Sequence, residues 1–87
     1  MKYTVVWKSS AEEELASLWM AAENRAAISV AANTIDQALR FDPNSVGESR
    51  RDSARILIVP PLVVTFDVLD DDRLVTILWV GTLRLPR

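Results

Sequence analysis

The fold of this chain is decided by the run LVVTFDVL-DDD-RLVTILWVG, which covers residues 62–69, 70–72 and 73–81. In its first part, apolar residues recur at every second position, which is the period of a β-strand. The three aspartates predict a turn, because Asp side chains bond to nearby backbone groups in turns. The last part is apolar at both alternating sets of positions, which favours a strand inside a sheet. The run therefore predicts an antiparallel hairpin.

The residues upstream extend this hairpin to a three-stranded meander. Residues 55–59 predict a strand, because residues 56–59 are apolar and rich in β-branched side chains, and Pro60-Pro61 ends the run. Residues 42–53 are polar and contain Pro43 and Gly47. They predict a loop of about a dozen residues, a length at which loops often carry functional residues.

Two helices are expected before this loop. Residues 10–13 read SAEE and fit a capping box, which predicts that the first helix begins with Ser10 as its N-cap. A break near residues 23–25 separates it from a second helix at residues 25–40. Apolar residues recur at spacings of three and four in both, which predicts a helical hairpin with one apolar stripe per helix. The stripes are Ala11, Leu15, Leu18, Trp19 and Ala22, and Ile28, Ala31, Ala32, Ile35, Ala38 and Leu39.

Residues 2–7 predict a further strand, because β-branched and aromatic side chains dominate them. The complete order is β-α-α-β-β-β. We expect an α+β fold in which the helical hairpin packs on one face of a mainly antiparallel sheet, within a single domain over residues 1–87. Tyr3 is expected in or near the core, and so are the three tryptophans, Trp7, Trp19 and Trp79, since each falls in an apolar pattern.

Composition excludes several kinds of site. The 87 residues include no Cys and no His, which removes disulfides, thiolate metal sites and the Ser-His-Asp and Cys-His forms of catalysis. The net charge of −2 gives no overall attraction to nucleic acid. The sequence shows neither a signal-peptide pattern nor an apolar run approaching the ~20 residues that span a bilayer. We therefore expect a cytoplasmic protein without a membrane partner.

The order and spacing of these segments resemble the RelE/ParE superfamily of toxins from bacterial type II toxin–antitoxin modules. The resemblance covers nearly all of the chain. Its segments are residues 3–7 with Ala11 and Leu15, residues 35–39 with Asp42-Pro43 and Gly47, and residues 55–57, 61–64, 66–68, 72–75 and 80–81. It implies an antitoxin partner whose C-terminal segment wraps the toxin. It also implies one of two activities, metal-free cleavage of mRNA in the ribosomal A site (RelE-like) or inhibition of DNA gyrase (ParE-like).

Metal-free RNA cleavage needs a base, a cation beside the phosphate and an acid. The resemblance implies that RelE-like enzymes supply them with basic residues on the sheet and a C-terminal Tyr or His. In this chain Tyr3 is the only Tyr, and no aromatic residue follows Arg84. Leu62 or Val63 stands where the ribonucleases carry an Arg. These departures favour the ParE-like activity and leave open whether the chain is an enzyme.

Arginines are the remaining candidates for a site, because their forked donors bind phosphate and carboxylate well. Arg50, Arg55 and Arg84 are candidates for holding phosphates, with Glu48 as the best available general base. Arg50, Arg51 and Arg73 are candidates for binding an anionic ligand. The alternative interpretation is that these are solvated loop and edge charges. No metal or cofactor is expected, because three consecutive Asp are usually a turn.

The sequence thus predicts a toxin that acts by binding protein partners and is neutralised by an antitoxin. The partners considered are a cognate antitoxin, DNA gyrase or the ribosome, and a second copy of the chain. Two alternatives remain open at this point. One is a ribosome-dependent mRNA endonuclease, and the other is a non-toxic, degenerate member of the fold.

Overall fold

The structure, a computed structural model, describes residues 2–46, 48–49 and 54–83. Its elements are β1 (Thr4–Trp7), α1 (Ser9–Ala21), α2 (Arg25–Phe41), β2 (Glu48–Ser49), β3 (Ala54–Val59), β4 (Leu62–Leu69) and β5 (Leu74–Thr82). The sheet order is β1-β5-β4-β3-β2. β1 runs parallel to β5, and the other neighbouring strands are antiparallel.

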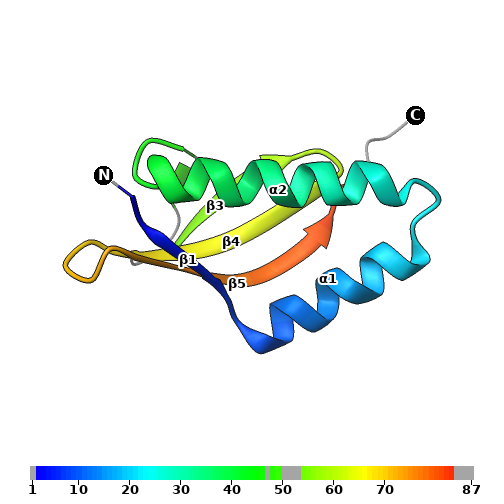
Figure 1. Cartoon of the computed structure of the whole chain (residues 1–87), viewed down its shortest axis with the longest axis horizontal. Coiled ribbons are helices and arrows are strands. Elements are labelled where there is room, and N and C mark those ends of the chain that lie inside the picture. The colour runs from blue at the N-terminus through cyan, green and yellow to red at the C-terminus, as the bar shows by residue number, and fades with distance from the viewer. Residues whose placement is uncertain (1, 47, 50–53, 84–87) are drawn as a thin grey trace.

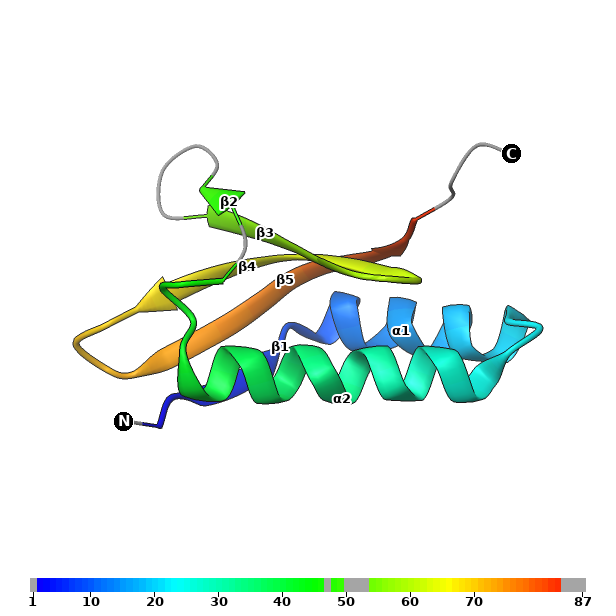
Figure 2. The same ribbon diagram turned by 90° about the horizontal axis from the view of Figure 1, so that it is seen from above.

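The helices form one layer and the sheet forms the other, which agrees with the α+β prediction. Both helices lie on one side of the sheet and are joined by a short connection, as Figures 1 and 2 show. β5 lies inside the sheet, between β1 and β4, which confirms what its apolar character on both faces predicts. Neither described helix has both the length and the apolar character needed to cross a membrane.

The core lies between the helices and the inner face of the sheet, the face that they cover. Phe66, Ile35, Leu39, Leu62 and Ile77 are all fully buried there. Each such side chain contributes about 1.5–3 kcal/mol relative to an exposed one. This contribution comes from alternating residues of β4 and β5 and from one stripe of α2, so the sheet and the second helix carry most of the core.

The start of α1 differs from the prediction. The helix begins at Ser9, and its N-cap is Lys8, whose side chain makes no capping bond among the described residues. The Lys8 backbone explains the difference. Its N–H donates to the Ile77 carbonyl (2.9 Å), and its own carbonyl accepts from the Glu12 N–H (2.9 Å). The chain therefore passes directly from the sheet ladder into the helix, which leaves Ser10 inside the first turn rather than at the cap.

The predicted loop at residues 42–53 contains a short strand. β2 pairs antiparallel with β3, with Glu48 opposite Ile56 and Ser49 opposite Arg55. Glu and Ser are weak strand formers, so the sequence carries no strand signal here. The order at these two residues comes from pairing with β3. Residues 47 and 50–53 of the loop lie outside the described residues.

A β-bulge changes the register between β4 and β5. Thr65 pairs with Trp79 and Phe66 pairs with Ile77, so Leu78 has no opposite residue on β4. Ile77 and Val80 are both buried, whereas Trp79 is 51% exposed. A bulge inserts one residue and changes which side chains face the core. The prediction that Trp79 belongs to the core is therefore wrong.

The other two tryptophans differ from each other. Trp7 is half-buried and packs against the core. Trp19 is 41% exposed at the C-terminal end of α1, so the core prediction is wrong for it too. Its position borders the space between the helices rather than the sheet. The apolar stripe predicts the side of α1 on which Trp19 lies, but it does not predict how deeply the Trp19 side chain is buried.

Candidate functional site

Three of the predicted site residues, Arg50, Arg51 and Arg84, lie outside the described residues. Arg55 is described. It lies on β3 opposite Phe66, and directly opposed residues of an antiparallel pair project to the same face. Arg55 therefore projects to the inner face, where its Nε and one terminal nitrogen both donate to the Val46 carbonyl at 3.2 Å. This contact fastens the loop after α2 to the edge of the sheet.

The remaining predicted residues lie on other elements. Glu48 is in β2. Arg73 ends the turn after β4 and is exposed, with a positive φ of 49°. Its N–H donates to the Asp70 carbonyl (3.2 Å), and its carbonyl accepts from the Thr4 N–H (2.8 Å). The backbone of Arg73 therefore links the β4–β5 turn to β1, and its side chain lies at the turn rather than on a face of the sheet.

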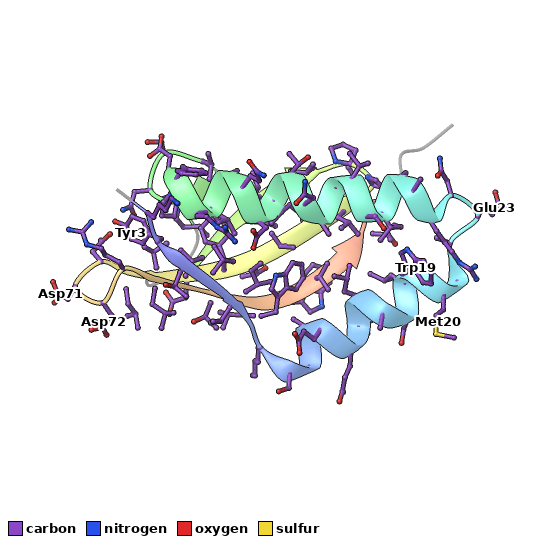
Figure 3. All side chains as sticks on the ribbon, in the orientation of Figure 1. Tyr3, Trp19, Met20, Glu23, Asp71 and Asp72 are labelled. Atoms are coloured by element: carbon purple, nitrogen blue, oxygen red, sulfur yellow. The ribbon has the colours of Figure 1, made fainter. Side chains whose placement is uncertain are left out.

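Tyr3, Asn44 and Asp70 form a cluster that the sequence analysis did not predict. The Asp70 carboxylate accepts from the Tyr3 hydroxyl (2.7 Å) and from the Asn44 side-chain amide (2.8 Å). Figure 3 shows Tyr3 beside the turn that carries Asp71 and Asp72. The cluster joins the start of the chain, the loop after α2 and the β4–β5 turn. Sequence spacing gives no signal for it, because the three residues are far apart in the chain.

The hydrogen bonds of this cluster shift the pKa values of Tyr3 and Asp70 in opposite directions. The bond to Asp70 is the main cause that raises the pKa of Tyr3 above its ordinary value. The bond from Asn44, followed by that from Tyr3, holds the pKa of Asp70 below its ordinary value. Tyr3 is therefore a protonated donor and Asp70 an ionised acceptor at neutral pH. These hydrogen bonds hold three segments of the chain together, and they give Tyr3 no tendency to act as a base.

The face of the sheet opposite the helices carries exposed apolar side chains. We define this outer face by Ile56, Ile58, Val63, Thr65, Asp67 and Trp79. On β4, Val63, Thr65 and Asp67 alternate with the fully buried Val64 and Phe66. Their neighbours on β3 and β5 project with them, since Ile58 is opposite Val63 and Trp79 is opposite Thr65. Figure 2 shows both helices on the other side.

On this face the ring of Trp79 occupies space beside Gly81 that a larger residue would fill. An ideal Cβ on Gly81 would lie 2.4 Å from the Cη2 atom of the Trp79 ring. The ring therefore lies over Gly81, in space that only a glycine leaves open. It remains half-exposed, and so does Ile58 at 50%.

Asp67 places a carboxylate beside these apolar residues. It lies between Ala54 on β3 and Thr76 on β5. Its Oδ1 atom is buried and has no hydrogen-bond partner in the part of the chain that the structure describes. A buried acceptor without a donor costs about 1–3 kcal/mol. The outer face thus combines an apolar ring with an acceptor that lacks a donor.

A second apolar surface lies between the helices. A groove of about 460 Å³ is lined by Glu12, Leu15, Ala16, Trp19, Met20, Ile28, Ser29 and Ala32. The Trp19 indole N–H donates to the Ser29 hydroxyl (3.2 Å), which fixes the ring at the wall of the groove. Figure 3 shows Trp19 and Met20 at the C-terminal end of α1. Among the described residues, no group of three or more acidic side chains is arranged to hold a metal ion.

Comparison with known proteins gives matches in structure but not in sequence. No protein-family model and no curated protein matches the chain. A chain of the RelBE2 toxin–antitoxin complex from Mycobacterium tuberculosis matches with a TM-score of 0.80 at 19% identity, over 95% of this chain and 93% of that chain. A chain of the chromosomal ParDE toxin–antitoxin system from P. aeruginosa matches with a TM-score of 0.73 at 15% identity, over 95% and 98%.

The isolated RelE toxin of E. coli also matches, with a TM-score of 0.68 at 11% identity, over 97% of this chain and 87% of that chain. RelE and ParE structures thus both resemble this chain over nearly its whole length. The chain has the RelE/ParE fold, which confirms the fold prediction. The fold alone does not separate the two activities, because one fold can carry unrelated functions.

Proposed function

We propose that this chain is the toxin of a type II toxin–antitoxin module, that an antitoxin neutralises it, and that it acts by binding a protein target, as ParE-like toxins act on DNA gyrase. The likeness to toxin–antitoxin structures over nearly the whole chain supports the first part. The small size fits as well, because a thin core favours stabilisation by a partner.

The burial of Leu62 and Val63 is the observation that favours a protein target over RNA. These are the positions at which the resemblance places the Arg of the ribonucleases. Leu62 is fully buried and Val63 is only 9% exposed. Aliphatic side chains at these positions supply no cation to a scissile phosphate, and electrostatic stabilisation is usually the largest part of such catalysis. Asp67, four residues after Val63 on the same face of β4, adds a negative charge to that face.

A ribosome-dependent mRNA endonuclease is the second candidate, because RelE structures match this chain as a ParDE structure does. In that case Arg50, Arg55 and Arg84 would hold phosphates, with Glu48 as base. Its chemistry would need another acid, because the 87 residues contain no His and Tyr3 is their single Tyr. A non-toxic member of the fold is the remaining outcome.

Induced expression in bacteria separates these candidates. We expect growth arrest, relief by co-expression of a cognate antitoxin, and gyrase-dependent DNA breaks without codon-positioned mRNA cuts in primer extension. A gene with a stop codon in place of Tyr3 is the control for the cost of transcription. Codon-positioned cuts would establish the endonuclease instead. Unimpaired growth at confirmed protein levels would establish a non-toxic protein.

A further inference from the structure

We draw no further inference here: the strongest candidate, the apolar groove between α1 and α2 that Trp19 and Met20 line, carries none, because nothing in the structure shows what covers it.

Discussion

The guanidinium of Arg25 lies over the ring of Trp19, 4.8 Å from the ring centroid. The same side chain donates from Nε to the Trp19 carbonyl (3.2 Å) and from a terminal nitrogen to the Met20 carbonyl (3.1 Å). The first residue of α2 thus caps the last turn of α1. A cation at this end is favourable because the helix dipole is negative there. The contact fixes both the turn between the helices and the wall of the groove.

Arg25→Ala should lower the free energy of unfolding by about 1 kcal/mol, since it removes a cap, a dipole partner and a cation–π contact together. Arg25→Lys should recover part of the loss, because Lys supplies the charge without the planar fork. Urea denaturation followed by circular dichroism measures both. Arg40→Ala is the matched control, because its exposed ion pair with Asp36 should contribute less than about 0.5 kcal/mol. Equal losses for Arg25→Ala and Arg40→Ala would contradict the capping role.

Gly81→Ala should displace the Trp79 ring. The new Cβ would meet ring carbons at 2.4 and 2.6 Å, and the exposed ring can yield more easily than the strand backbone. We expect a loss of about 1 kcal/mol, the cost of leaving a preferred rotamer, and a changed indole N–H resonance. The double variant Trp79→Thr and Gly81→Ala is the control. If the ring is the only obstacle, Gly81→Ala should cost much less in the Trp79→Thr background.

The sequence predicted the elements that are determined by local pattern. The alternation in residues 62–69 gave β4 with its observed bounds, and the spacing in residues 25–40 gave α2 to within one residue. The interior position of β5 followed from apolar residues on both faces. Such features depend on a repeat within one segment, and that repeat is visible without knowledge of the rest of the chain.

The features of the candidate site depend instead on contacts between segments. The bulge at Leu78 changes which face Trp79 occupies, and nothing in the alternation of β5 marks it. The start of α1 is set by bonds between Lys8 and Ile77, which lie in different segments. In the sequence, Asp67 is simply a polar residue at an alternating position of a strand. Only the packing of its neighbours shows that one of its oxygens is buried and has no donor among the described residues.

Asp67→Thr should stabilise the free protein. Thr is β-branched, suits a strand position and removes the buried carboxylate oxygen, which has no donor in the part of the chain that the structure describes. We expect the free energy of unfolding to rise by about 1 kcal/mol in urea denaturation at neutral pH. Asp71→Thr, in the exposed turn, is the control for the change of net charge and should give no gain. A destabilised Asp67→Thr variant would show that the carboxylate supports the fold.

The bond between Tyr3 and Asp70 should make stability depend on pH in two windows. The pKa of Asp70 is lowered from its ordinary value of 3.8, so its contribution is present above that value and is lost as pH falls through the lowered folded-state pKa. The pKa of Tyr3 is raised from 10.0, so its contribution is present below that value and is lost as pH rises through the folded-state pKa.

Melting temperatures between pH 2 and pH 11 measure these windows. Asp70→Asn should flatten the acid window and reduce the alkaline one, because it removes the ionised acceptor that holds the Tyr3 proton. Tyr3→Phe should abolish the alkaline window and leave part of the acid one, since Asn44 still donates to Asp70. Asp72→Asn removes a carboxylate from the same turn and serves as the control. Identical pH profiles for Asp70→Asn and Asp72→Asn would show that the cluster does not tie the chain start to the turn in solution.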